Sequence, residues 1–286
     1  MGFFRDLTMN EGGYRGRLAP TPTGYLHRGH ANTFLKAQER AQSHRGQLIL
    51  RVEDLDQDRC KPEFVDALLE DLKWAGLAWD EGPDVGGPYP SYNQSERLEH
   101  YQEAWRRLRN SLAVFPCSCS RKDVRMAVQA PHSEEGELIY PGFCRDKPFK
   151  FPSEEQALSV NWRFRVPVGE AIAFEDGNYG HKEFVAGRDF GDFLVWRKDG
   201  IPSYELAVVA DDIAMGVTEV VRGEDLLMST ARQLLLYEAL GVKAPAFYHC
   251  PLVRDETGRR LAKRNKAASL RELRESGLDP LQLQVV

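Results

Sequence analysis

The stretch that decides the fold reads GRLAPTPTGYLHRGHANTF and covers residues 16–34. Residues 16–20 predict a short strand, and TPTG predicts a turn. Apolar side chains at helical spacing then predict a helix over residues 31–45, with Gly46 at its end. The next segment, LILRVED at 48–54, is a compact apolar run that ends in charge, which predicts a second strand. The chain thus opens with a strand-helix-strand order.

Two further segments continue this order. PEFVDALLEDLKWAG (62–76) begins with proline and ends with glycine, an asymmetry that is typical of a helix. SERLEHYQEAWRRL (95–108) predicts another helix, with Ser95 as its N-cap and one apolar face. Strands that alternate with helices indicate an α/β fold, in which a parallel sheet is covered by helices on both faces.

The pattern changes after Asn110. Between Cys117 and about Arg188 the chain is rich in loops and includes the strand-like run NWRFRVPV (161–168), so we interpret this part as an insertion. Alternation returns in DFLVWRKDGIPSYELAVVADD, and the run at 229–240 predicts a helix. The prediction is an α/β domain in two halves, interrupted by an inserted segment.

Two histidines mark the point where the first turn becomes a helix. His27 and His30 flank Gly29 there. The N-terminus of a helix attracts anions, because its backbone N–H groups are unpaired and its dipole end is positive. Imidazoles can donate to phosphate oxygens, and glycine lets a nucleotide approach the backbone closely. These residues therefore predict a phosphate site.

Composition excludes some classes of protein. The 286 residues carry 38 Lys and Arg against 43 Asp and Glu, a net charge of −5. This is not the balance of a general nucleic-acid binder, although a local basic patch is enough to bind RNA. Apolar runs are far shorter than the roughly 20 residues of a membrane span, and the start does not predict a secretion signal. Five cysteines, an odd number, favour a reducing compartment. We expect a cytoplasmic protein that does not associate with membranes.

The segment around the histidines resembles a known family. HRGH is similar to the HIGH motif of class I aminoacyl-tRNA synthetases, with Arg28 in place of isoleucine. RLAPTPTG before it and LRVEDLD after it resemble the glutamyl branch of that class, and the resemblance extends over nearly the whole chain. It implies a Rossmann-type catalytic domain that binds ATP. The implied ATP-binding residues include His27, Gly29 and His30, and both histidines would act in catalysis.

The same resemblance implies a pocket for an acidic amino acid. Arg17 stands where the branch has an arginine that holds the side-chain carboxylate, and a planar guanidinium suits that task because it forms two parallel hydrogen bonds. Arg222 would be a second cation, and such a pair would reject the neutral amide of glutamine. Without the motif, Arg17 would be an ordinary surface ion pair and Tyr204 a core aromatic. The implied glutamate-binding residues are Arg17, Thr21, Glu53, Tyr204 and Arg222.

A basic segment, RRLAKRNKAAS at 259–269, would by itself be a solvated surface loop. Its place just after PLVRDETG resembles the mobile KMSKS loop of the class. The second lysine of that loop stabilises charge that develops on the phosphates as pyrophosphate leaves. Here that lysine is Lys263, which would bind ATP and act in catalysis. Arg260 replaces the first lysine and would also bind ATP.

Three cysteines predict a metal site. Cys117 and Cys119 are one residue apart, and Cys144 follows at a distance, so their thiolates can meet around a structural Zn²⁺. Spacing does not identify the fourth ligand, and three buried free thiols are the alternative. The resemblance implies Tyr140, because the glutamyl-queuosine enzymes and some glutamyl synthetases have C-x-C…Y-x-x-x-C in this insertion. His132 is the rival ligand.

Two kinds of glutamyl enzyme fit these motifs. Val208 replaces an asparagine that is usual in full-length glutamyl-tRNA synthetases, and the chain stops shortly after the KMSKS-like loop, so we expect no anticodon-binding domain. Both features resemble the short glutamyl-queuosine enzymes, whereas the loop at 80–97 is similar to the full-length ones. The implied division is a Rossmann-type catalytic domain in two halves (1–110 and 190–250), a zinc-containing acceptor-binding insertion (111–189), and the KMSKS-like loop with a short helical C-terminal segment (251–286).

The reaction that the resemblance implies is the activation of L-glutamate by ATP to glutamyl-adenylate, with Mg²⁺ accompanying ATP. Glutamate would then pass to queuosine in the anticodon of tRNA(Asp). Three alternatives stay open: transfer to the 3′ end of a tRNA by a truncated glutamyl-tRNA synthetase, ligation to a small acceptor, and a non-catalytic zinc-stabilised RNA-binding module. We expect a monomer.

Overall fold

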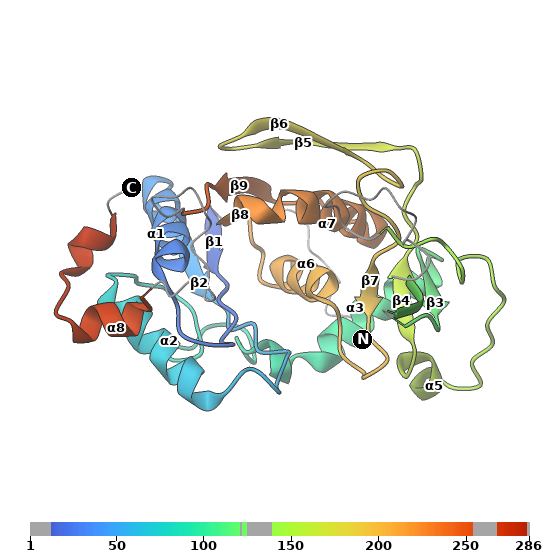
Figure 1. The fold of residues 1–286 in the computed structure, drawn as a ribbon, viewed down its shortest axis with the longest axis horizontal. Coiled ribbons are helices and arrows are strands. Elements are labelled where there is room, and N and C mark those ends of the chain that lie inside the picture. The colour runs from blue at the N-terminus through green and yellow to red at the C-terminus, as the bar shows by residue number, and fades with distance from the viewer. Residues whose placement is uncertain (1–12, 121, 125–138, 254–267, 285–286) are drawn as a thin grey trace.

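The computed structural model describes residues 13–120, 122–124, 139–253 and 268–284. Its first half confirms the predicted order of elements (Figure 1). The first two strands pair in parallel along their whole length, as the crossover through a helix between them requires. Proline occupies the first turn of the second helix. These elements are β1 (Arg15–Leu18), α1 (Arg28–Ser43), β2 (Gln47–Leu50) and α2 (Pro62–Trp74).

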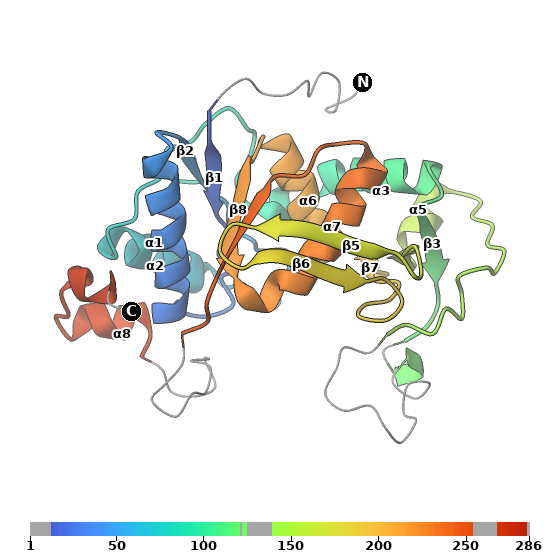
Figure 2. The ribbon, with the colours of Figure 1, turned by 90° about the horizontal axis from the view of Figure 1, so that it is seen from above.

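The second half of the α/β domain adds two parallel strands with helices between and before them. Its strand β8 lies beside β1, and the Thr218 N–H donates to the Arg15 carbonyl at 2.9 Å (Figure 2). Strands from the two halves of the chain are thereby brought side by side. The elements are α6 (Tyr204–Ala214), β8 (Glu219–Gly223), the short 3₁₀ turn η2 (Glu224–Leu226), α7 (Leu227–Leu240) and β9 (Ala246–Cys250).

The larger hydrophobic core joins these helices to the insertion. α6 is buried over most of its surface, including its three acidic residues, Glu205, Asp211 and Asp212. Trp105 of α3 (Leu98–Asn110) packs edge to face on Trp162, with ring centroids 5.3 Å apart, and lies 6.1 Å from Trp196. A smaller core lies between α1, α2, β1 and β2.

The insertion contains a small antiparallel sheet of its own, at the right of Figure 1. The predicted strand at 161–168 is shorter than expected and forms its centre. The sheet consists of β3 (Val114–Cys117), β4 (Asn161–Phe164) and β7 (Leu194–Trp196), with the helix α5 (Glu154–Leu158) before β4.

A hairpin of β5 (Ala171–Asp176) and β6 (Gly180–Val185) leaves the insertion and runs along the α/β domain (Figure 2). β5 pairs with β9 through Asp176 and Phe247. Sheet pairing therefore crosses the domain boundary that the sequence predicts between residues 189 and 190. The β5–β6 hairpin, which precedes that boundary, extends the β8–β9 sheet of the α/β domain, whereas β7, which follows it, joins the small sheet of the insertion. The division of the chain into domains stays a prediction.

The start of α3 differs from the prediction. Ser95 is not its N-cap: the residue lies in a 3₁₀ turn, η1 (Gln94–Glu96), and the helix begins at Leu98 after Arg97. The Ser95 N–H and hydroxyl both donate to the Asp54 carboxylate, at 2.8 and 2.6 Å. The Asp54 carboxylate, which is 41 residues away in sequence, thus binds the Ser95 side chain that the local sequence pattern assigns to capping the helix.

The C-terminal segment returns to the start of α1. It contains α8 (Leu270–Glu275) and η4 (Pro280–Gln284), and α8 opens with a capping box between Ser269 and Glu272. Ser269 also forms an isolated bridge with His27, and the Leu270 N–H donates to the Leu26 carbonyl at 2.7 Å. Among the described helices, none combines the length and the apolar character needed to cross a membrane.

Candidate active site

A cavity of about 290 Å³ opens at the carboxyl ends of the parallel strands. Ligands of open α/β sheets bind at this edge. Its walls come from both halves of the chain, because β1 and β8 are neighbours. Eight of the predicted catalytic, ATP-binding and glutamate-binding residues line it; the other two, Arg260 and Lys263, lie outside the described residues. The eight are Arg17, Thr21, His27, Gly29, His30, Glu53, Tyr204 and Arg222.

The two histidines are held by the helix start itself. His27 is the N-cap of α1, and its Nδ1 accepts from the Gly29 N–H at 3.1 Å. His30 Nδ1 accepts from the His27 N–H at 3.2 Å, and the ring centroids are 3.9 Å apart. Because each Nδ1 is an acceptor, each neutral ring carries its proton on Nε2. The pair can therefore offer Nε2–H donors to an anion.

Gly29 leaves room for the first of these rings. A Cβ atom at position 29 would lie 3.0 Å from Cε1 and 3.1 Å from Nδ1 of His27. The sequence predicts that ATP binds at this helix start, and on that prediction Gly29→Ala should displace the His27 ring and raise KM for ATP about three- to tenfold. The free energy of unfolding should change little, since the preference of a helix for alanine over glycine, about 0.5–1 kcal/mol, offsets the weakened His27 cap. KM measurements and urea unfolding, with Asn32→Ala as a control on the same helix, check this; an unchanged KM would contradict it.

Arg17 is not a surface ion pair, because only 4% of it is exposed. Its Nη1 donates to the Val221 carbonyl at 2.7 Å, which places it beside Arg222. Its Nε lies 3.8 Å from Asp212 Oδ1 and has no hydrogen-bond acceptor within the part of the chain that the structure describes. Burial lowers the pKa of the Arg17 guanidinium, with Asp212 opposing the shift. A buried cation in this position favours binding of an anion.

Arg222, also 4% exposed, lies on β8, the strand beside the one that carries Arg17. Its Nε lies 3.1 Å from His249 Nε2, its Nη1 donates to Gln233 Oε1 at 2.8 Å, and its Nη2 donates to Thr230 Oγ1 at 2.7 Å. All three partners are uncharged acceptors if His249 is neutral. Arg222 therefore has no carboxylate among these three hydrogen-bond partners, and the buried Glu205 acts on its charge from behind Gln233, to which it is bonded at 2.8 Å.

The remaining predicted residues bring one carboxyl and two hydroxyls to the cavity, which Asp225, Thr23 and Thr33 also line. Glu53 is 7% exposed and accepts from Arg51 at 3.3 Å. Burial raises the pKa of Glu53, and Arg51 and Arg17 act against that shift. Tyr204 is the first residue of α6 and is 39% exposed toward the cavity, so it is not a core aromatic. Thr21 is exposed on the turn after β1.

A buried ionic network supports these groups, and sequence reasoning missed it. Arg51 is fully buried and donates to Asp212 at 2.7 Å; its Nε lies 3.7 Å from Asp211. Asp211 also accepts from Arg97 at 2.7 Å and from Tyr101 at 2.8 Å. Two adjacent acidic residues in the apolar helix segment LAVVADDIA were the available signal, since buried carboxylates need cationic partners.

The residues on both sides of segment 254–267 lie at this cavity. Pro251, Leu252 and Val253 line it before that segment, and Ser269 bridges His27 after it. The Leu252 N–H donates to Glu224 at 3.1 Å, which fixes the approach. Both flanks of the KMSKS-like segment therefore lie beside the histidine pair.

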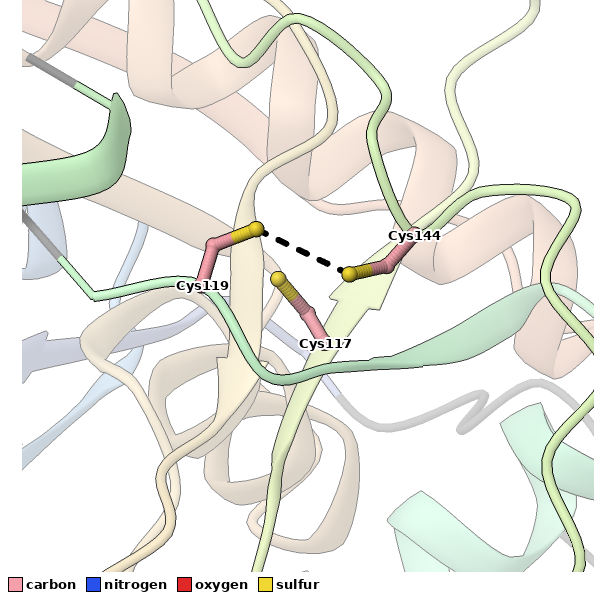
Figure 3. A group of neighbouring side chains, drawn as sticks. All are labelled: Cys117, Cys119 and Cys144. Atoms are coloured by element: carbon pink, nitrogen blue, oxygen red, sulfur yellow. Dashed lines mark hydrogen bonds between the residues drawn. The ribbon is translucent and has the colours of Figure 1, made fainter. Parts of the chain in front are cut away.

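The three predicted cysteines meet beyond the end of β3, and their sulfur atoms point toward one another (Figure 3). The sulfur atoms all lie within 4.8 Å of one another, and those of Cys119 and Cys144 are 3.6 Å apart. The Tyr140 hydroxyl oxygen is 3.4 Å from Cys117 Sγ and 3.6 Å from Cys119 Sγ. A tetrahedral zinc with 2.3 Å bonds to sulfur places two sulfurs about 3.8 Å apart. The donor set and its spacing therefore fit a metal ion; His132 lies outside the described residues.

Charge around the cluster also suits a metal. Burial acts against ionisation of Cys144, but hydrogen bonds from Tyr140 and Ser118 outweigh it and lower the pKa of the thiol to about 6. Burial raises the pKa of Cys119 to about 11. The Arg163 side chain donates to Cys117 Sγ at 3.4 Å, and its guanidinium lies 4.0 Å from the Tyr140 ring centroid. Arg163 therefore places positive charge beside two of the four candidate ligands, Cys117 and Tyr140.

Comparison with known proteins agrees with this arrangement. Residues 14–285 match the family described as tRNA synthetases class I (E and Q), catalytic domain. The match covers almost the whole chain and includes every residue of the cavity. The chain therefore belongs to this family of class I tRNA synthetases.

Individual relatives are similar over most of the chain. A "Glutamyl-Q tRNA(Asp) synthetase" of Nitratidesulfovibrio vulgaris is 46% identical over 266 residues, which is 92% of this chain and 82% of that protein. Another of that name, from Symbiobacterium thermophilum, is 47% identical over 271 residues, covering 93% and 82%. The crystal structure of a glutamate tRNA ligase from Elizabethkingia meningosepticum in complex with its amino acid superposes with a TM-score of 0.80 at 30% identity. That match covers 93% of this chain but only 58% of the ligase.

Proposed function

We propose that this chain activates L-glutamate with ATP and transfers it to queuosine in the anticodon of tRNA(Asp). The observation that carries the proposal is one cavity lined by a histidine pair at a helix start and by two buried arginines on neighbouring strands. Two relatives that share 46% and 47% of their aligned residues with the chain bear the name glutamyl-Q tRNA(Asp) synthetase, which supports this acceptor.

Glutamate binds with its side-chain carboxylate between Arg17 and Arg222. The carboxylate neutralises two cations that burial leaves poorly solvated, whereas the neutral amide of glutamine does not. Glu53 faces the ammonium group, and the hydroxyls of Tyr204 and Thr21 complete the contacts. The α-carboxylate is left directed toward the histidine pair.

ATP binds across the start of α1, with His27, Gly29 and His30 at its phosphates. An oxygen of the glutamate α-carboxylate attacks the α-phosphorus, and the bond to the bridging oxygen breaks as pyrophosphate leaves. Lys263 and Arg260, which lie outside the described residues, are assigned to the phosphates because the two flanks of their segment lie at the cavity. Positioning and neutralisation of charge account for the rate, without a protein nucleophile. ATP enters as its Mg²⁺ complex, because Mg²⁺ binds substrate phosphates readily.

Glutamate-dependent exchange of pyrophosphate into ATP tests the first step. Exchange that requires glutamate and is not supported by glutamine is the expected result. Absence of exchange in the presence of bound ATP would favour a non-catalytic RNA-binding module instead. For the second step, labelled glutamate is offered with tRNA(Asp) that carries queuosine and with the same tRNA lacking it. Equal charging of both, with label released from the 3′ end, would identify a glutamyl-tRNA synthetase.

The ionisation of Glu53 makes glutamate binding depend on pH. Burial raises the pKa of this carboxyl, so it takes up a proton at a higher pH than an ordinary glutamate side chain. Only the ionised form attracts the substrate ammonium. KM for glutamate should therefore rise as the pH falls through the raised pKa, and Glu53→Gln should give a high KM that lacks this rise. Exchange kinetics between about pH 5 and 8 provide the measurement.

We infer that the cluster beyond β3 holds a structural Zn²⁺ through Cys117, Cys119, Cys144 and the Tyr140 oxygen. The ion would tie the residue 140–144 turn to the end of β3. Protein purified without chelator should contain about one zinc per chain, and its removal should lower the melting temperature by about 5–10 °C. Tyr140→Phe should weaken zinc binding at least about tenfold, whereas Tyr25→Phe should not. Less than about a tenth of a zinc per chain would contradict the inference.

Three further properties belong to the same proposal. The insertion (111–189) contacts the nucleic acid, the two catalytic halves (1–110 and 190–250) bind the small substrates, and 251–286 carries the KMSKS-like loop. The protein acts as a monomer in the cytoplasm. None of the five cysteines forms a disulfide, which supports a reducing compartment.

A further inference from the structure

A chain of three buried side chains leads from the hairpin to the cavity. Asp176 Oδ2, at the end of β5, lies 2.6 Å from His249 Nδ1. His249 Nε2, on β9, lies 3.1 Å from Arg222 Nε, on β8. His249 is 0% exposed, and Asp176 and Arg222 are each 4% exposed. The sequence gives no local signal for this arrangement, since the aspartate and the histidine are 73 residues apart.

The hydrogen bonds fix which nitrogen of His249 carries the proton. A carboxylate accepts only, so Nδ1 must donate to Asp176. A guanidinium donates only, so Nε2 must accept from Arg222. Both conditions hold for a single form, the neutral ring with its proton on Nδ1. Burial and the charge of Arg222 lower the pKa of His249, which keeps the ring neutral.

The same aspartate shapes the hairpin turn. Asp176 Oδ1 accepts from the N–H groups of Asn178, at 3.0 Å, and Tyr179, at 2.9 Å. Asn178 also donates to the His249 carbonyl at 3.0 Å, and Tyr179 donates to Glu224. The turn that closes β5 and β6 is therefore bonded to the strand that carries His249 and to the edge of the cavity.

We propose that Asp176 and His249 are positioning residues that orient the Arg222 guanidinium toward the side-chain carboxylate of the amino-acid substrate. The inference rests on the proposed role of Arg222 in binding glutamate. Arg222 has a long side chain, and its direction decides how well it meets a carboxylate. Three acceptors, His249 Nε2, Thr230 Oγ1 and Gln233 Oε1, hold its three nitrogens. Asp176 in turn holds His249 at 2.6 Å, and Glu205 holds Gln233 at 2.8 Å.

Two substitutions break the Asp176–His249–Arg222 chain of hydrogen bonds, called the relay below, in different ways. His249→Phe keeps an aromatic ring but removes the acceptor. Asp176→Asn is nearly isosteric and keeps an oxygen that can accept from the turn. Its amide N–H₂ group, however, would face His249 Nδ1 and donate to it. The ring proton would then sit on Nε2, where it would face the N–H donors of Arg222. Each should raise KM for glutamate about ten- to a hundredfold, the effect of losing a hydrogen bond to a charged group. KM for ATP should change less than about threefold in the same assays.

The chain offers a matched control on the same hairpin. His181 Nδ1 lies 2.8 Å from Glu175 Oε1, and both side chains are largely exposed. His181→Phe removes the same kind of pair from a surface position and should leave KM for glutamate unchanged. His249→Gln should recover most of the affinity, because its amide oxygen can accept where Nε2 did.

A double-mutant cycle separates positioning from general damage. If His249 acts through Arg222, then Arg222→Ala combined with His249→Phe should raise KM no more than Arg222→Ala alone. Additive effects would indicate a merely structural role and overturn the inference. If His249→Phe fails to fold in a thermal melt, the cycle of Asp176→Asn with Arg222→Ala decides the question in the same way.

The possible failures are distinguishable. If the wild-type protein shows no glutamate-dependent exchange, the proposed function itself is wrong. Wild-type activity with an unchanged KM in Arg222→Ala removes the role of Arg222 and the relay with it. A raised KM in Arg222→Ala, together with unchanged values in both relay variants, removes the relay alone.

Discussion

Arg17→Lys is expected to lower kcat/KM for glutamate about a hundredfold to a thousandfold in pyrophosphate exchange, since two charge-assisted hydrogen bonds to the substrate carboxylate are lost. Lysine keeps the charge but not the planar pair of donors. Its shorter reach also leaves the Val221 carbonyl without the 2.7 Å bond that now fixes the guanidinium. KM for ATP should stay within about threefold of the wild-type value, because the histidine pair is untouched.

Arg97→Lys is the matched control for this variant. Arg97 is also buried, at 7% exposure, and pairs with Asp211, but it does not line the cavity. The Arg97→Lys variant should be less stable than the wild-type chain but should keep its affinity for glutamate. If both variants lowered kcat/KM for glutamate equally, or if Arg17→Lys left it unchanged, the proposed pocket for the side-chain carboxylate would be wrong.

Asp212→Ala is expected to lower the free energy of unfolding by about 3–5 kcal/mol, the cost of leaving a buried charge without its partner. Asp212 is 2% exposed and lies 2.7 Å from the fully buried Arg51 and 3.8 Å from Arg17. Urea unfolding of the wild-type and variant chains provides the measurement.

An exposed carboxylate gives the comparison. Asp199 pairs with Arg197 on the surface, and Asp199→Ala should change stability by less than about 1 kcal/mol. Adding Arg51→Met to Asp212→Ala should recover part of the loss, because the fully buried cation goes with its partner. A loss below about 1 kcal/mol in Asp212→Ala would show that the network does not contribute to folding.

Local patterns predicted the elements well and their partners less well. Strand and helix positions up to α3 follow from apolar spacing, proline and glycine, all of which act within one or two turns of the chain. Ser95 failed as a predicted cap because Asp54, which is 41 residues away in sequence, binds its hydroxyl. The pairing of β5 with β9 likewise depends on residues that are distant in the chain, and no periodicity indicates it.

The residues of the candidate site likewise fall into those that local patterns predicted and those that depend on distant partners. Motif residues on turns, such as His27 and Gly29, were predictable because a helix start dictates their chemistry. Tyr140 and Arg222 came only from the family resemblance, since neither spacing nor hydropathy distinguishes them. Arg51 and His249 were missed, because a buried polar side chain in or just after a short strand is informative only once its partner is known. The structure places them in contact with groups from other elements.

The two arginines of the cavity come from opposite ends of the polypeptide: Arg17 bonds to the carbonyl of a residue 204 positions later. During synthesis, a ribosome must therefore complete most of the chain before both cations exist side by side. A chain that ends before β8 contains Arg17 and the histidine pair but lacks the Arg222 wall of the cavity, so under the proposed function it should not bind glutamate.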